Sequence, residues 1–205
     1  MTDLINQTTQ EITNSIYLSG TILSSFKYDH TCMGEKFYEF ELGTMRRSGV
    51  MDKTKVIISE RLLYFCDKKK GDKIAIEGQI RTHNINHVLK IYVFVQEVYD
   101  AIDQDVNEVT VIGHVGKDVV YRETPSGREV TDVMLAVNRR YNKSDYIPCI
   151  CWGRNARYAG KKLSVGSKVA LTGRLQSRDY EKKLPDGEIV KKTATELSVC
   201  ELHLL

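Results

Sequence analysis

Aromatic and arginine side chains gather in one stretch of the chain, residues 135–152, which reads LAVNRRYNKSDYIPCICW. Its alternating apolar residues predict two strands joined by a short polar turn. The side chains that could do chemistry there are Arg139, Arg140, Tyr141, Tyr146 and Trp152. Flat rings stack on unpaired bases, and guanidinium groups bind the phosphates between those bases. Rings and guanidinium groups on one extended surface therefore predict binding of a single-stranded nucleic acid.

The charge of the chain is balanced rather than strongly basic. There are 30 lysines and arginines against 27 aspartates and glutamates, which gives a formal net charge of +3. Residues 1–102 carry 13 of each sign, so the remaining 17 basic and 14 acidic residues place the whole excess in the second half. Positive charge must therefore be positioned rather than abundant, and it lies in the half that holds the aromatic stretch.

Cysteine usage and hydropathy indicate the compartment. Five cysteines, an odd number without a repeated CxxC spacing, argue against a disulfide framework or a structural zinc site. A reducing cytoplasm is therefore the expected location. No apolar run approaches the roughly 18 residues of a membrane helix, so we expect no membrane contact. The polar start MTDLINQTTQEITNS lacks the features of a signal peptide.

Motifs for catalysis or cofactor binding are incomplete. The segment GRNARYAGKK, residues 153–162, lacks the GxxxxGK[ST] spacing of a phosphate-binding loop. His83 and His87 are four residues apart in HNINH, which we expect to be a polar hairpin tip, and no third metal ligand is nearby. The carboxylates are expected to be scattered on strand exteriors. We therefore expect no catalytic residues, no metal and no cofactor.

The chain repeats itself at about half its length. NSIYLSGTI, residues 14–22, matches NEVTVIGHV, residues 107–115, in its apolar alternation and its glycine, at an offset of 93. The same offset aligns GEKFYEFELGTMRR with GREVTDVMLAVNRR, and an offset of 95 aligns KGDKIAIEGQIRT with VGSKVALTGRLQS. Two copies of one domain are therefore predicted, residues 1–102 and 103–205, joined by the short acidic linker DAIDQD.

Within each copy apolar residues alternate with a period of two, which predicts strands. In the second copy we expect strands at residues 107–116, 128–140, 146–152, 167–180 and 189–202. A helix is expected at residues 154–163, and ERLLYFCDKKK takes its place in the first copy. Five strands with one helix between the third and the fourth are the layout of the five-stranded Greek-key barrel called the OB-fold. We therefore predict an all-β protein of two tandem OB-folds.

The second copy resembles the bacterial single-stranded DNA-binding proteins. The resemblance covers residues 107–204 and rests on six segments in the family's order. They are N-x-V-x-V-x-G from Asn107, LAVNRR from Leu135, CWG from Cys151, the helix, VGSKVALTGRLQSRDYE from Val165 and TATELSV from Thr193. Members of this family bind single strands on OB-folds with little sequence preference.

The resemblance implies base-stacking roles for four aromatic residues on the second, third and fourth strands. They are Tyr141, Tyr146, Trp152 and Tyr180. Family members often carry tryptophan at several of these positions, so tyrosines offer less stacking area per site. The candidate phosphate contacts are Arg139, Arg140, Arg154, Arg174, Arg178, Arg46, Arg47 and Arg61. Because only a few phosphates would be neutralised per domain, salt should weaken binding without abolishing it.

The first copy departs from this pattern. At the positions equivalent to the four rings it has Ser48, Lys53, Ser59 and Ile85. We hypothesise that this degenerate copy guides the phosphate backbone or forms an assembly surface, so residues 1–102 alone would bind far more weakly than residues 104–205. Other aromatic residues of this copy are candidates for a differently placed platform: Tyr28, Phe37, Tyr38, Tyr64, Tyr92 and Phe94.

The resemblance also bears on assembly. Single-domain members of the family form tetramers, so two barrels per chain suggest a homodimer that presents four OB-folds. Strand one commonly pairs across subunits in this family, and the two copies could equally pair within one chain. The sequence ends at SVCELHLL without the family's acidic C-terminal tail, so we expect no recruitment of partner enzymes through such a tail.

These features predict a non-enzymatic protein that binds single-stranded DNA with little sequence preference, in replication, recombination or repair. The alternative is an interaction module of the type of primosomal replication protein N, whose OB-fold mainly bridges partner proteins. A nucleic-acid enzyme is a third reading, and no motif in the sequence favours it.

Overall fold

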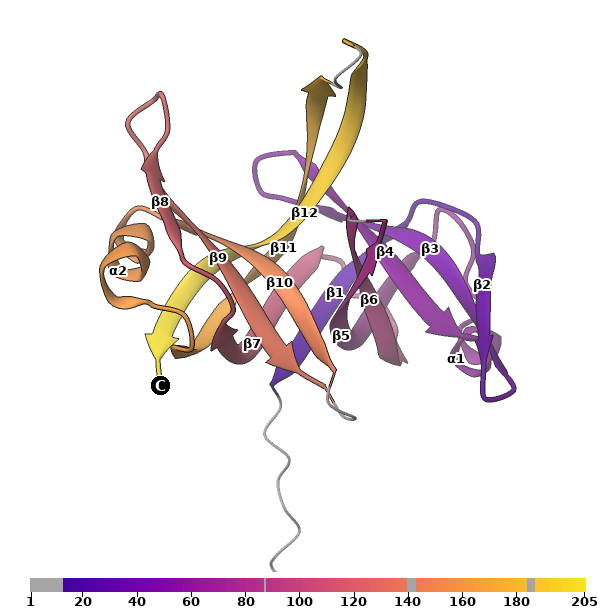
Figure 1. Ribbon diagram of the computed structural model, residues 1–205. Helices are drawn as coiled ribbons and strands as arrows, with labels where there is room; N and C mark the ends of the chain where they lie inside the picture. Colours follow the sequence, from indigo (N-terminus) through magenta and orange to yellow (C-terminus); the bar gives the residue numbers. More distant parts are fainter. Residues whose placement is uncertain (1–12, 87, 140–142, 184–186) are drawn as a thin grey trace, which may run out of the picture.

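The computed structural model describes residues 13–86, 88–139, 143–183 and 187–205, in which we find twelve strands and two helices (Figure 1). The first half contains β1 (Asn14–Ile22), β2 (Lys27–Cys32), β3 (Glu35–Met45), β4 (Met51–Ser59), α1 (Glu60–Cys66), β5 (Lys73–Ile85) and β6 (Val88–Tyr99). The second half contains β7 (Val106–Val115), β8 (Val120–Glu123), β9 (Glu129–Asn138), β10 (Ser144–Trp152), α2 (Arg154–Lys162), β11 (Lys168–Lys183) and β12 (Ile189–Leu204). The domain boundary expected between residues 102 and 103 falls between β6 and β7.

Each half closes its sheet into a barrel. In the second half β7 pairs antiparallel with β9 and β11, β9 pairs with β10, β11 pairs with β12, and a parallel contact of β10 with β12 completes the ring. The first half has the same order with β1, β3, β4, β6 and β5. Five strands in this order, with a helix after the third, confirm the predicted all-β class with two tandem OB-folds.

The barrel interiors follow from the alternation of the strands. Successive side chains of a strand point to opposite faces, so every second residue turns inward. The inward residues of β1 and β7 are almost fully buried: Ile16, Leu18, Val109 and Val111. The repeated glycine of these strands has a different cause. A Cβ on Gly20 or on Gly113 would overlap a backbone carbonyl of β3 or β9, where each barrel closes.

The two barrels join edge to edge through β1 and β7, which pair antiparallel within one continuous twelve-stranded sheet. Ile16 lies opposite Val109, which is its own counterpart in the repeat. A register centred on two equivalent residues relates the barrels by an approximate two-fold axis at this pair. The first strands of the two copies therefore pair inside one chain. Helices α1 and α2 lie at opposite ends of the molecule (Figure 1).

The structure corrects several expected elements. β8 was not predicted, and like β2 it adds a short strand outside the barrel ring, paired with β9. β11 continues past residue 180 and pairs with the first residues of β12 in a long hairpin that projects from the barrel (Figure 1), and β12 continues past residue 202 alongside the start of β11. His83 lies within β5 rather than at a hairpin tip. Its partner in the HNINH segment, His87, lies outside the described residues.

Candidate nucleic-acid interface

A buried aspartate fastens the second barrel to the first. Asp145 of β10 is fully buried, and its carboxylate accepts hydrogen bonds from Arg139 and Arg81. It also accepts from the backbone N–H of Thr82 in β5. Arg139 donates in turn to the carbonyl oxygen of Thr82 at 2.9 Å. The hydrogen bond to Asp145 raises the pKa of Arg139, because it favours the charged guanidinium.

The approximate two-fold axis places an equivalent cluster on the other side of the junction. Asp52 of β4 is buried and accepts from Arg46 and from the backbone N–H of Ser177 at 2.7 Å. Arg46 donates to the carbonyl oxygen of Ser177 at 3.1 Å, and its hydrogen bond to Asp52 raises its pKa. We call the two clusters the Arg139 clamp (Arg139, Asp145, Thr82) and the Arg46 clamp (Arg46, Asp52, Ser177).

The clamps correct the expectation that the carboxylates lie on strand exteriors, and they give two candidate phosphate contacts a structural role. Carboxylates were expected on strand exteriors, yet Asp52 and Asp145 are buried because each satisfies donors from both barrels at once. Arg139 and Arg46, two candidate phosphate contacts, are held by these carboxylates. A buried carboxylate needs its cation, since an unpaired buried charge is strongly destabilising. The first structural task of both guanidinium groups is therefore to fix the barrels relative to each other.

A hollow on the outer face of the second barrel contains Trp152, whose side chain is 42% exposed. The hollow has a volume of about 520 Å³ and takes its walls from both barrels. The second barrel contributes Arg122, Thr124, Ile150, Trp152, Gln176, Ser177, Arg178, Asp179 and Glu196, and the first contributes Arg46, Val50, Met51 and Lys53. An exposed indole beside guanidinium and ammonium groups can stack a base and hold its phosphate.

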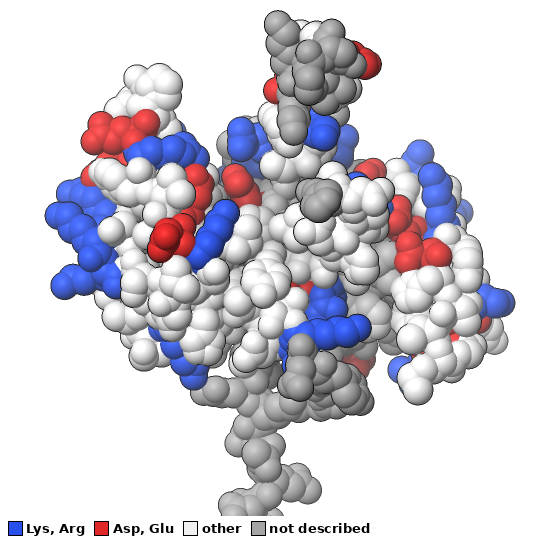
Figure 2. All heavy atoms as spheres, in the orientation of Figure 1, with Lys and Arg blue, Asp and Glu red and all other residues white. Residues whose placement is uncertain are grey.

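A second hollow, of about 910 Å³, continues from the first and shares Lys53, Asp179 and Glu196 with it. Its walls include Tyr180, which is 38% exposed, and Pro148 of β10. We call the two hollows together the central groove. It runs across the barrel junction at the base of the β11–β12 hairpin, and Figure 2 shows Lys and Arg side chains on both sides of that base.

The remaining predicted rings do not line the central groove among the described residues. Tyr146 is 49% exposed and follows the same face of β10 as Pro148 and Trp152, since residues two apart share a face. Its backbone N–H donates to the Thr82 hydroxyl of the Arg139 clamp at 2.9 Å. Tyr141 lies outside the described residues, as does Arg140. Trp152, Tyr146 and Tyr180 are thus open to solvent rather than packed in the barrel core.

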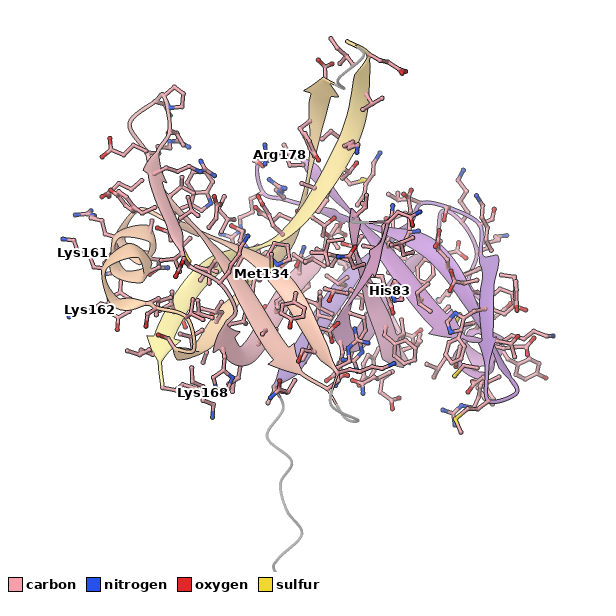
Figure 3. All side chains as sticks on the ribbon, in the orientation of Figure 1. His83, Met134, Lys161, Lys162, Lys168 and Arg178 are labelled. Atoms are coloured by element: carbon pink, nitrogen blue, oxygen red, sulfur yellow. The ribbon has the colours of Figure 1, made fainter. Side chains whose placement is uncertain are left out.

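The other candidate phosphate contacts are spread over the molecule. Arg178 lines the central groove with Trp152, and Figure 3 shows it beside the base of the β11–β12 hairpin. Arg47 and Arg174 meet in a different hollow, next to Asp105 and Glu108. Arg61 and Arg154 are on α1 and α2, at opposite ends of the molecule (Figure 1). Among the described candidate phosphate contacts, Arg178 is therefore the one that lines the groove beside the rings without being bound to a buried aspartate.

Sequence reasoning missed the lysines of the groove. The first barrel contributes Lys53, Lys55 and Lys90, and the second contributes Lys192. Lys53 is the counterpart of Tyr146 in the repeat. The alignment therefore showed only that the first copy lacks a ring there, and not that it supplies a cation to the groove. The repeat alignment names this residue, but only the pairing of β1 with β7 places it in the groove of the other barrel.

One acidic residue of the groove is perturbed by its surroundings. Burial raises the pKa of Glu196, and the nearby cations Arg178 and Arg122 partly oppose this increase. Glu196 lines both hollows of the central groove. Cys149 and Cys151 of β10 are buried, and burial raises the pKa of Cys151 to about 12. These thiols are packing residues rather than nucleophiles.

No group of three or more His, Cys, Asp or Glu side chains is placed to hold a metal ion among the residues that the structure describes. Neither of its two helices is long and apolar enough to cross a membrane.

Residues 106–205 match the family model described as "Single-strand binding protein family". A single-stranded DNA-binding protein of Clostridium tetani is 36% identical over 105 residues, which are 48% of this chain and 70% of that protein. Single-stranded DNA-binding protein 1 of Staphylococcus aureus is 42% identical over 81 residues, and the chain spans only about half of its length, 48%. The crystal structure of the wild-type single-stranded DNA binding protein from Thermus aquaticus has a TM-score of 0.75 at 20% identity, over 94% of this chain and 92% of that chain. That likeness covers both barrels and supports the fold.

Proposed function

Because the chain belongs to the single-strand binding protein family, we propose that it binds single-stranded DNA with little sequence preference, in replication, recombination or repair. The observation that carries this proposal is the central groove. It presents the exposed rings of Trp152 and Tyr180 together with Arg178 and with lysines from both barrels. Every base has a face that can stack on such rings, so the groove selects for unpaired bases rather than for a sequence.

In this proposal the rings and the cations have separate tasks. Trp152, Tyr180 and Tyr146 stack bases, and Tyr141 remains a proposed fourth ring. Arg178 and Lys53 neutralise phosphates, while the clamp arginines position the groove walls. Each stacked base contributes about 1–3 kcal/mol. The remaining described candidates for phosphate contacts would then act only on longer strands: Arg61 and Arg154 on the helices, and Arg47 and Arg174 beside Asp105.

The proposed activity is binding without a covalent step. The groove holds stacking rings and cations, and among the described residues no group of three or more His, Cys, Asp or Glu side chains is placed to hold a metal ion. Incubation of the protein with labelled DNA and Mg²⁺ checks this part of the proposal. We expect the DNA to stay intact, and cleavage that copurifies with the protein would contradict a purely binding role.

The chain offers a direct test, because Trp152 is its only tryptophan. Titration with oligo(dT) should quench the fluorescence of Trp152, since a base stacked on the indole changes its surroundings. A duplex of the same composition should not quench it, because its bases are already stacked. The matched control is Tyr158→Ala, which removes a 40% exposed ring from α2, away from the groove. Unchanged fluorescence with a saturating single strand would remove the basis of the proposal.

We also propose that two chains associate to present four OB-folds. In support, the pairing of β1 with β7 already joins two barrels edge to edge within one chain. In the family that the second copy resembles, strand one commonly forms such a pair between subunits. The solution mass measured with and without a defined oligonucleotide tests this assembly. We expect twice the mass of the chain in both states, and a chain that remains single at micromolar concentration would refute it.

A further inference from the structure

Three aromatic rings form a ladder across the first barrel, although this barrel lacks rings at the four aligned positions. His30 of β2 and Phe37 of β3 stack with their centroids 4.9 Å apart and their planes 8° from parallel. Phe37 and Phe94 of β6 follow with centroids 5.6 Å apart. We call these three side chains the ring ladder.

The ring ladder lies on the face that corresponds to the groove face of the second barrel. Phe37 pairs with Ser59 across β3 and β4, and its counterpart Val130 pairs with Trp152 across β9 and β10. Side chains of directly paired residues share one face of a sheet. Phe37 is therefore on the same side of its barrel as Trp152 is of the other, but it comes from the neighbouring strand.

The position that lost its ring has a local structural role. Ser59 is buried and ends β4, and its hydroxyl accepts a hydrogen bond from the backbone N–H of Leu62 in the first turn of α1. A serine cap of this kind stabilises a short helix by about 1 kcal/mol. The ring on this face of the first barrel thus comes from β3, while the position aligned with Trp152 caps α1.

The ring ladder is open to solvent at its ends. The side chain of His30 is 48% exposed, and Phe94 is half-buried, while Phe37 is covered by the rings on either side. The imidazole of His30 is held in place by a hydrogen bond of 2.6 Å to the adjacent residue, Asp29. A base can therefore extend the stack without first moving a side chain out of the way.

The ladder is continuous with the central groove along β6. Lys90 lines the groove beside Tyr180, and Tyr92 and Phe94 follow Lys90 at intervals of two residues on the same face of the strand. His83 of β5 pairs with Lys90, and Figure 3 shows it near the junction of the barrels. Cations, then rings, therefore line one path from the second barrel onto the first.

We propose that the ring ladder is a second base-stacking site for single-stranded nucleic acid, reached from the central groove along β6. One strand then passes over both barrels, using Trp152 and Tyr180 on one and His30 and Phe94 on the other. This site rests on the proposed function, and it replaces the hypothesis that the first copy only guides the backbone. The two barrels stack bases with rings from different strands of the same fold.

The length of the strand separates the two sites in the full chain. An oligo(dT) of roughly 8 nucleotides fills one OB-fold, and one of roughly 30 exceeds a single fold. The double variant His30→Ala/Phe94→Ala should weaken binding of the long oligonucleotide about fivefold or more, since at least one stacked base is lost. Its affinity for the short oligonucleotide, measured through Trp152 fluorescence, should stay unchanged.

Two controls make the outcome decisive. Tyr28→Ala removes another exposed ring of β2, which contacts Tyr38 rather than the ladder, and it should change neither affinity. If the double variant does not fold, His30→Ala alone carries the test, because that side chain is half exposed and its loss should weaken only the long oligonucleotide. Wild-type affinity for the long strand in these variants would show that the ladder only packs the β2–β3 hairpin. Absence of Trp152 quenching by the short strand in the wild type would instead refute the proposed function itself.

Discussion

The two barrels share a scaffold but differ on the face that meets a ligand. Both clamps are built from an arginine, a buried aspartate and a hydroxyl residue at repeat-related positions. On the outer faces, by contrast, the repeat has Trp152 where the first copy has Ser59, and Val130 where the first copy has Phe37. The repeat therefore preserved what holds the barrels together, while the rings were redistributed among strands. Equivalent position in the repeat is a poor guide to equivalent function on a surface.

The clamps are expected to show the largest effect. Asp145→Ala should lower the free energy of unfolding by about 3–5 kcal/mol, because it leaves the two partly buried guanidinium groups of Arg81 and Arg139 without their carboxylate. Asp52→Ala should cost less, since only one arginine depends on it. Chemical denaturation measures both. Asp132→Ala breaks an exposed pair with Arg122 and should cost under about 1 kcal/mol; equal losses for all three would contradict the assigned role of the clamps.

The rings of the second barrel come next. Trp152→Ala should weaken oligo(dT) binding by about 1–3 kcal/mol, or roughly five- to 150-fold, through loss of one stacked base. Binding is measured by anisotropy of a labelled oligonucleotide, because the variant has no tryptophan. Tyr158→Ala removes an exposed ring of α2 away from the groove and should leave the affinity unchanged.

The groove lysines should change the salt dependence more than the affinity at one salt concentration. Lys53→Ala removes one phosphate contact, so the slope of log K against log salt should decrease by about 0.7. Titrations of oligo(dT) at several salt concentrations measure this slope. Lys168→Ala is the matched control, because Figure 3 shows Lys168 at the far lower edge of the second barrel. A slope that falls equally in both variants would mean that Lys53 acts only through net charge.

The smallest expected effect concerns Glu196. Its pKa is raised by burial, so protonation begins at a higher pH than for an ordinary glutamate and removes a negative charge from the groove as the pH falls. Glu196→Gln should therefore bind oligo(dT) a few-fold tighter at pH 7, and the difference from wild type should shrink toward pH 5. Asp132, Asp179, Arg122 and Arg178 are present in both proteins, so the comparison isolates the charge of Glu196. A constant difference at all pH values would exclude titration of Glu196 as its cause.

Much of the scaffold could be predicted from local patterns. Period-two alternation gave the strands, the repeat gave two barrels, and the segments around Trp152 placed an exposed ring on β10. The elements that were missed depend on pairing. β8 is only four residues long, and the last residues of β11 pair with the first residues of β12 in the projecting hairpin, outside the barrel. No local composition signal marks a strand of that kind.

The candidate site was predicted less completely than the fold. Trp152, Tyr180 and Arg178 meet in the central groove, but Arg46 and Arg139 are bound to buried aspartates, and the helical arginines lie at the two ends of the molecule. An arginine next to a strand looks the same in the sequence whether it faces solvent or a carboxylate from across a junction. The burial of Asp52 and Asp145 had no sequence signal, because each also accepts from a backbone N–H of the other barrel, more than 60 residues away.

The sequence by itself determined the type of fold, the number of barrels and the chemistry of the rings, because these depend on short-range alternation and residue identity. Only the tertiary structure decided which cations face the rings. The antiparallel pairing of β1 with β7 turns the first barrel so that Lys53, Lys55 and Lys90 line the groove of the second. Such neighbours are set by one register between distant strands, and a shift of that register by one residue would turn the side chains of the paired strands to the opposite face.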